Sequence, residues 1–222
     1  MTNKIVGIFG GAFDPVHKGH IKIAEQCIKT IGMEKIIIVP TGVSPFKKEL
    51  TNEKTRLSIL QIAFSNDQYE ISDYELRQSK KDKNPSYTIN TLKFLTKKSP
   101  SSFVLIMGSD ALATINKWYQ WKMILNYCHI LVVSRKEDDL KVDCLDPKVI
   151  DFVKKHKIDK LEDLSIKDKG GIYFAKFPLL PFSSTDIRTK MSQKKSIENL
   201  VTPEVSDFIK KTASYTSDGH KI

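Results

Sequence analysis

The chain has few cysteines and no long apolar runs among its 222 residues. Its three cysteines, Cys27, Cys128 and Cys144, are odd in number and form no close pair, which argues against a disulfide framework and against a zinc knuckle. The longest apolar stretches, such as 36–39 and 103–107, are far shorter than a bilayer span. The N-terminus leads directly into a predicted strand rather than a signal sequence, so the sequence predicts a cytoplasmic protein with no membrane partner.

Arginine is also scarce, although the chain is strongly basic. Only four of the 36 basic residues are arginines, and the formal net charge is +10. Such a charge could attract nucleic acid or small phosphorylated ligands. Proteins that read nucleic acid tend to use arginine for bidentate contacts, and the lysines here are scattered, without an aromatic platform. The composition therefore favours small anionic ligands, and a basic nucleic-acid-binding module stays as an alternative of another class.

Short runs rich in β-branched residues alternate with segments of helical spacing. The runs cover residues 4–9, 35–40, 102–107 and 129–134, and a last strand is expected over 172–177. Helices are expected after the first run, from near Thr51, after Ser86 and after Pro203. This alternation predicts an α/β fold with a doubly wound, mostly parallel, Rossmann-like sheet. Such sheets bind ligands beyond the carboxyl ends of their strands, where the strand order changes direction.

One domain accounts for the length of the chain. We expect residues 1–212 to form it, with a surface insertion at about 136–171, where the sequence is dense in lysine and aspartate. The insertion is predicted to hold one or two short helices. Residues 213–222 are predicted to be a flexible C-terminal tail. The oligomeric state does not follow from the sequence, which is compatible with a homo-oligomer.

The most informative stretch follows the first predicted strand. Residues 10–20 read Gly-Gly-Ala-Phe-Asp-Pro-Val-His-Lys-Gly-His. Glycines at the end of a strand let backbone N–H groups face an anion, and a helix start adds the positive end of its dipole. His17 and His20 are three residues apart, so both imidazoles could donate hydrogen bonds to a triphosphate. Taken alone, each could equally be a helix cap or a solvated side chain, and Asp14 could simply cap the turn.

A second helix start lies near the C-terminus. In Ser183-Ser184-Thr185-Asp186-Ile187-Arg188, hydroxyl and N–H groups come first and an arginine follows one turn later. An arginine in that place can clamp a phosphate bidentately. The structural alternative is an ordinary N-cap with a surface arginine. Arg56 and Arg77 are predicted to brace helices and loops rather than to touch a ligand.

Together these segments resemble a known superfamily. Residues 10–20, with the core Phe-Asp-Pro-x-His-x-Gly-His, and residues 183–188 are similar to the two signatures of the nucleotidyltransferases that transfer AMP or CMP to phosphate acceptors. Further segments resemble those of bacterial nicotinate mononucleotide adenylyltransferases: Pro-Ser-Tyr-Thr-Ile-Asn-Thr-Leu at 85–92, Gly-Ser-Asp-Ala-Leu at 108–112, Trp-Tyr-Gln-Trp at 118–121 and Leu-Val-Thr-Pro-Glu-Val at 200–205. The resemblance runs in order from about residue 4 to residue 210.

The resemblance implies an enzyme of NAD biosynthesis. It would join ATP to nicotinate mononucleotide, forming nicotinate adenine dinucleotide and pyrophosphate, with Mg²⁺ bound mainly through the ATP phosphates and with no metal ligands of its own. The phosphate of the mononucleotide would attack the α-phosphorus of ATP directly, so no protein nucleophile is needed.

The resemblance also implies roles for individual residues. His17, His20 and Arg188 would be catalytic, with His20 the main stabiliser of the transition state. ATP would be bound by Gly10, Gly11, Ala12, Phe13, Gly108, Asp110, Ser183, Ser184 and Thr185. The mononucleotide would be bound by Asp14, Lys47, Thr88, Trp118 and Tyr119.

The chain departs from the family pattern in the loop at Pro45-Phe46-Lys47, where the family has Pro-His-Lys. A histidine on the acceptor side is therefore replaced by Phe46. Two further enzymes of the superfamily stay as alternatives, a nicotinamide mononucleotide adenylyltransferase and a phosphopantetheine adenylyltransferase. A nucleotide sensor without turnover is disfavoured by the intact His17, His20 and Arg188.

Overall fold

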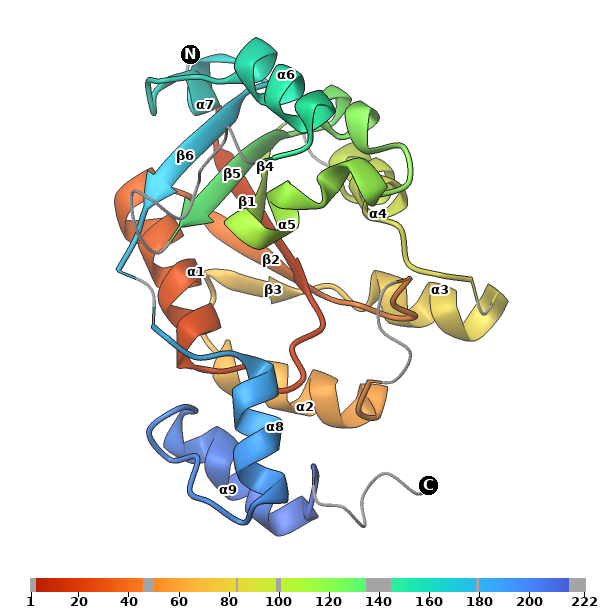
Figure 1. The fold of residues 1–222 in the computed structure, drawn as a ribbon, viewed down its shortest axis with the longest axis vertical. Helices are drawn as coiled ribbons and strands as arrows, with labels where there is room; N and C mark the ends of the chain where they lie inside the picture. Colours follow the sequence, from red (N-terminus) through yellow and green to blue (C-terminus); the bar gives the residue numbers. More distant parts are fainter. Residues whose placement is uncertain are drawn as a thin grey trace.

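A parallel sheet of six strands forms the centre of the protein in the computed structural model, which describes residues 3–45, 50–82, 84–98, 101–134, 145–178 and 180–215. The strands are β1 (Ile5–Gly11), β2 (Lys35–Pro40), β3 (Tyr69–Ile71), β4 (Ser102–Gly108), β5 (His129–Ser134) and β6 (Ile172–Lys176). Every neighbouring pair is parallel. The predicted α/β class and the mostly parallel sheet are therefore confirmed (Figure 1).

The strand order, β3-β2-β1-β4-β5-β6, changes direction at β1. From β1 the chain winds first through β2 and β3 to one edge, and then returns to β4 on the other side of β1 and continues to β5 and β6. The carboxyl ends of β1 and β4 therefore flank the switch point at which α/β sheets bind ligands. Gly10 and Gly11 end β1, and Gly108 ends β4.

Helices cover both faces of the sheet because alternate residues of each strand point to opposite sides. On one face Phe9 and Ile106 pack against α1 (Lys18–Ile31), α2 (Glu53–Ala63), α8 (Ser184–Ser192) and α9 (Pro203–Thr212). On the other face Ile8 and Leu105 pack against α4 (Thr88–Leu95), α5 (Ser109–Ala113), the 3-10 helix η3 (Trp121–Asn126) and α6 (Pro147–His156). The remaining elements are α3 (Tyr74–Asp82), η1 (Thr96–Lys98), η2 (Ile115–Lys117) and α7 (Asp163–Ile166).

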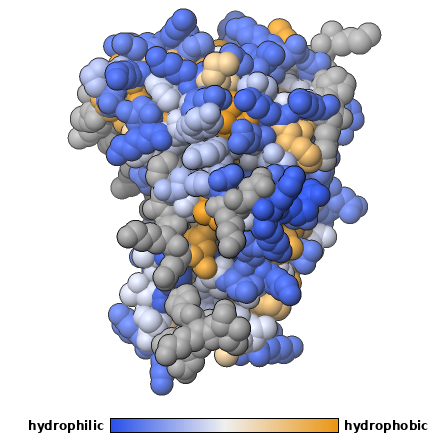
Figure 2. Space-filling view, turned by 90° about the vertical axis from the view of Figure 1, so that its right-hand side faces the viewer, coloured by the Kyte–Doolittle hydropathy of each residue, from blue (hydrophilic) through white to orange (hydrophobic). Residues whose placement is uncertain are grey.

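The face of the molecule on the side of α3 and α4 is mostly hydrophilic, and its apolar areas are small and separate (Figure 2). The described part of the chain contains no helix that is long and apolar enough to cross a membrane.

The segment expected as a surface insertion carries α6 and α7 in its described part. Val149 and Phe152 of α6 and Leu164 of α7 are buried in the two core clusters, so these helices contribute to the core as well as to the surface. Residues 136–144 lie outside the described residues. At the other end of the chain, the expected flexibility of the tail does not extend to Tyr215, which is 7% exposed and packs in the core.

His129, the first residue of β5, is a buried histidine whose two ring nitrogens are both engaged. Nδ1 accepts the N–H of Gly171 at 2.9 Å, and Nε2 lies 2.9 Å from the carbonyl oxygen of Lys167. Because the Gly171 N–H can only donate, Nδ1 carries no proton and Nε2 donates to Lys167. Burial lowers the pKa of His129 below its usual value, so the folded protein holds this ring neutral.

This neutral ring makes folding stability depend on pH. As the pH falls through about 6.5, the unfolded state binds a proton at His129 that the folded state resists, so the free energy of unfolding should fall. Urea unfolding at pH 7.5, 6.5 and 5.5 measures the slope. In the His129→Gln variant the free energy of unfolding should depend less on pH. We expect its slope to be smaller than that of the wild type by up to about 1.4 kcal/mol per pH unit. Equal slopes in the two proteins would contradict the assignment.

Candidate active site

A pocket of about 610 Å³ opens at the carboxyl ends of the central strands. Gly10 and Gly11 at the end of β1 and Gly108 at the end of β4 form its floor, together with Thr41 and Ser44 after β2. The other wall comes from residues 86–88 and 117–119. The strand-end glycines are thus brought together with three residues of the predicted acceptor set, Thr88, Trp118 and Tyr119.

The acceptor wall combines aromatic rings with a helix start. The rings of Tyr87 and Tyr119 are 4.8 Å apart, and Tyr119 is 52% exposed. Trp118 is partly buried between the pocket and the core. Tyr87 is the N-cap of α4, and its side chain makes no capping hydrogen bond. The first-turn N–H groups of α4, which begins at Thr88, are therefore suited to an anionic group beside a flat ring.

His17 and His20 cap the helix that follows the glycine turn. His17 is the N-cap of α1, and its Nδ1 accepts the N–H of Gly19 at 3.1 Å. In return, Nδ1 of His20 accepts the N–H of His17 at 3.3 Å. The two rings stack with their centroids 3.8 Å apart. Because each Nδ1 accepts from a backbone N–H, each neutral ring carries its proton on Nε2, the atom that could donate to a phosphate oxygen.

Gly19 and Phe13 are both tightly packed against the histidines of this loop. A Cβ atom on Gly19 would lie 2.9 Å from the ring of His17, so the spacing His-x-Gly-His needs a glycine in the third place. Phe13 has a φ angle of +46° and is 2% exposed. Its ring packs edge-on against His20 with centroids 5.0 Å apart, and against Phe9, which lines the pocket. Phe13 thereby supports the glycine turn from behind.

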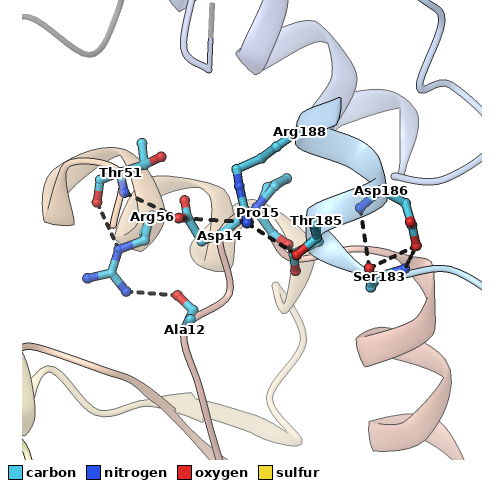
Figure 3. Close-up of polar contacts among 10 residues, drawn as sticks. Ala12, Asp14, Pro15, Thr51, Arg56, Ser183, Thr185, Asp186 and Arg188 are labelled. Atoms are coloured by element: carbon cyan, nitrogen blue, oxygen red, sulfur yellow. Dashed lines mark hydrogen bonds and ion pairs between the residues drawn. The ribbon is translucent and has the colours of Figure 1, made fainter. Parts of the chain in front are cut away.

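The start of α8 is docked onto the same loop (Figure 3). Ser183 and Asp186 form a capping box, in which the Asp186 carboxylate accepts the N–H of Ser183 at 2.7 Å. The hydroxyl of Ser184 donates to the carbonyl oxygen of Pro15 at 2.9 Å. Arg188 donates to the carbonyl oxygen of Asp14 at 2.5 Å, and its other terminal nitrogen lies 3.3 Å from Thr185 Oγ1. The two segments that carry the sequence signatures are therefore in direct contact.

Many predicted site residues do not line the pocket. They lie in the loop after β1 and at the starts of α1 and α8, and include Ala12, Phe13, His17, His20, Ser183, Ser184, Thr185 and Arg188. Asp14 is 3% exposed, and its carboxylate accepts the N–H of Thr51 at 3.3 Å, so it lies inside the loop structure rather than in the pocket wall. Asp110 is exposed in the first turn of α5 and is not among the residues that line the pocket. Lys47 and Phe46 lie outside the described residues.

Glu75 is a pocket residue that the sequence reasoning missed. It belongs to α3, and its carboxylate accepts the hydroxyl of Thr91 at 2.7 Å. Burial raises its pKa. Its neighbour Arg77 pairs with Asp73 on the surface, and no signal in the sequence separates Glu75 from these solvated charges. Lys117, which precedes Trp118 in the pocket wall, was likewise missed.

Among the residues that the structure describes, no group of three or more histidine, cysteine or acidic side chains is placed to hold a metal ion. The pocket lining supplies hydroxyl groups and backbone N–H groups at strand ends, which suit phosphate oxygens.

Comparison with known proteins first defines the class of protein to which this chain belongs. Residues 8–190 match the family model described as cytidylyltransferase-like, so the chain is a nucleotidyltransferase, in agreement with its fold and its two signature segments. Its relatives include proteins named as probable nicotinate-nucleotide adenylyltransferases. The protein of Psychromonas ingrahamii is 34% identical over 218 residues, 97% of this chain and 99% of the relative, and that of Yersinia pestis is 31% identical over 217 residues, 96% of each chain. The chain belongs to the nicotinate-nucleotide adenylyltransferase family.

A solved structure shares the fold. The nicotinic acid mononucleotide adenylyltransferase of Plasmodium falciparum, solved in complex with NaAD, is 19% identical and superimposes with a TM-score of 0.70 over 96% of this chain and 97% of its own.

The capping role of His17 can be separated from any chemical role. Replacing His17 by alanine removes the acceptor for the Gly19 N–H, so we expect the free energy of unfolding to fall by about 1 kcal/mol. Asparagine is a good N-cap, and His17→Asn should recover most of this loss. Chemical denaturation measures both variants. A His17→Asn protein as unstable as His17→Ala would show that the ring packing against Phe182 and His20, rather than the cap, carries the stability.

Proposed function

We propose that this protein transfers the adenylyl group of ATP to nicotinate mononucleotide, forming nicotinate adenine dinucleotide and pyrophosphate for NAD biosynthesis. The observation that carries the proposal is the composition of one pocket. It joins the glycine turn of β1 and the end of β4 to the uncapped start of α4 and an aromatic wall. One side suits a triphosphate, and the other suits a flat ring that bears a carboxylate.

On the ATP side, His17 and His20 donate from Nε2 to the phosphates, and His20 is the main donor as charge develops on the α-phosphate and the leaving pyrophosphate. The backbone N–H groups of residues 10–13, ending in the turn held by Phe13, face the phosphate chain. Ser183, Ser184 and Thr185 at the start of α8, with Arg188, complete the phosphate site. Gly108 and Asp110 lie at the end of β4 and the start of α5, which suits contact with a ribose.

On the acceptor side, the N–H groups at Thr88 receive the pyridine carboxylate, and Trp118 and Tyr119 stack on the ring. Selection of the acid over the amide follows from these donors, because an N–H group pairs better with a carboxylate than with a carboxamide nitrogen. Asp14 acts by holding the loop, and Lys47 is proposed to reach the acceptor phosphate.

The reaction needs alignment and charge stabilisation rather than a protein nucleophile. A phosphate oxygen of the mononucleotide attacks the α-phosphorus of ATP in line, the bond to the bridging oxygen breaks, and pyrophosphate leaves with the electron pair. Nucleotidyltransferases usually use a divalent metal ion with their nucleoside triphosphate. We propose that Mg²⁺ enters as the ATP complex, as part of the substrate.

Product analysis tests the substrate assignment. The protein is incubated with ATP and Mg²⁺ and, in parallel, with nicotinate mononucleotide, nicotinamide mononucleotide or phosphopantetheine. We expect the acid mononucleotide to have the highest kcat/KM. A preference for either of the other acceptors would replace the assignment by the corresponding alternative. Steeply salt-dependent binding of RNA or DNA without any consumption of ATP would favour the nucleic-acid-binding alternative.

A cytoplasmic location and a homo-oligomer stay predictions.

His20 provides the sharpest single-residue test. We expect His20→Ala to lower kcat by roughly 100- to 1,000-fold, because it removes a donor to charge that builds up in the transition state. Steady-state kinetics at saturating substrates measure the change, and a thermal melt confirms that the variant is folded. The matched control is His156→Ala, which removes an imidazole of α6 that contacts the carbonyl oxygen of Gly170 and the ring of Phe152, and which should leave kcat within about twofold. Near-normal turnover of His20→Ala would remove the assignment.

A further inference from the structure

Arg56 is a buried cation for which the proposed chemistry has no use. It lies in the first turn of α2 and is 1% exposed. Its guanidinium group donates to three main-chain carbonyl oxygens: Nη1 to Ala12 at 2.8 Å, Nη2 to Thr41 at 2.8 Å and Nε to Thr51 at 3.0 Å. Figure 3 shows this group beside the loop that holds Asp14. One side chain therefore binds the backbone of three separate segments.

Two of these segments are the places where β1 and β2 stop pairing. The ladder of the two strands ends at the pair Gly11 and Pro40, and the N–H of Thr41 still donates to the carbonyl oxygen of Gly11 at 2.9 Å. Beyond this point, Ala12 leads into the histidine loop and Thr41 into the loop on the acceptor side. Gly11 and Thr41 both line the pocket. Arg56 thus connects the two loops immediately beyond the last hydrogen bond between β1 and β2.

The third segment continues the connection to α8. Thr51, whose carbonyl oxygen accepts from Arg56, donates its own N–H to the carboxylate of Asp14 at 3.3 Å. The carbonyl oxygen of Asp14 in turn accepts from Arg188 at 2.5 Å. A continuous set of hydrogen bonds therefore runs from the acceptor loop at Thr41 to the proposed phosphate-binding arginine.

The surroundings of Arg56 bury its side chain and balance its charge. Burial lowers the pKa of Arg56, and the nearby carboxylate of Asp14 is the first of several acidic groups that oppose this effect. Tyr215 places its buried hydroxyl beside Asp14 and Thr51, so the C-terminal part of the described chain closes the cluster from behind. Only the planar guanidinium offers donors in three fixed directions, and the ammonium of lysine does not.

We propose that Arg56 is a positioning residue for adenylyl transfer, which holds the loops after β1 and β2 at the separation that the two substrates require. The effect of Arg56 on the rate of adenylyl transfer rests on the proposed function, whereas its effect on the geometry of the ATP-binding loop does not. Because in-line attack tolerates little displacement of the reacting groups, an error of about 1 Å between the loops should cost about 100-fold in rate.

The test compares Arg56→Met and Arg56→Lys with a matched control in the full-length chain. Arg77→Met makes the same change at a 61% exposed side chain, which pairs with the surface carboxylate of Asp73 at 3.0 Å. The kcat for dinucleotide formation is measured well below the melting temperature of each variant, and the affinity for ATP is measured separately by calorimetry. We expect kcat to fall about 100-fold in Arg56→Met and about tenfold in Arg56→Lys, with ATP bound several-fold more weakly, and to stay within about twofold in Arg77→Met.

A merely structural role would give a different result. Variants of Arg56 that melt at a lower temperature but keep kcat and ATP affinity within threefold of the wild type would overturn the inference, as would an equal loss in Arg77→Met. If Arg56→Met does not fold, Arg56→Lys decides by the same criteria, because it keeps the charge that Asp14 faces. If the wild type binds ATP but forms no dinucleotide, the proposed function fails, and the ATP affinities alone decide the role of Arg56.

Discussion

The site depends on one feature of the sheet, the parallel pairing of β1 with β2 on one side and with β4 on the other. Because the chain winds outward from β1 in both directions, the segments that follow β1 and β4 leave the sheet toward opposite faces and a crevice opens between them. The ladder between β1 and β4 ends at the pair Phe9 and Ile106, and beyond it the glycines that end both strands face the crevice. The pocket floor of Gly10, Gly11 and Gly108 is a direct consequence of this pairing.

Several side chains around the crevice serve folding and chemistry with different atoms. His17 and His20 each use Nδ1 to cap α1, which places the ring proton on Nε2. Arg188, one turn into α8, uses its guanidinium group to hold the carbonyl oxygen of Asp14. The geometry of the proposed phosphate site is therefore set by the same hydrogen bonds that close the loop.

The parts of the fold that the sequence predicted well are those with strong local patterns. The strands at 35–40, 102–107 and 129–134 lie within one residue of β2, β4 and β5, because continuous β-branched runs belong to strands buried on both faces. The three-residue strand β3 was missed, since Tyr69–Ile71 is too short to show a pattern. The sequence placed Tyr215 in the predicted flexible tail because the groups that it packs beside, Asp14 and Thr51, lie far away in the sequence.

By itself the sequence determined the kinds of chemistry present: a glycine turn, two imidazoles at a helix start, a second helix start with an arginine, and the α/β alternation that places such turns at strand ends. Only the tertiary structure decided which of these groups meet. It buried Asp14 away from the pocket, placed Glu75 in its wall, and used Arg56 to bridge three segments. The reason is physical, since contacts such as that between Arg188 and Asp14 join residues 174 positions apart, and local patterns carry no information about separations of that size.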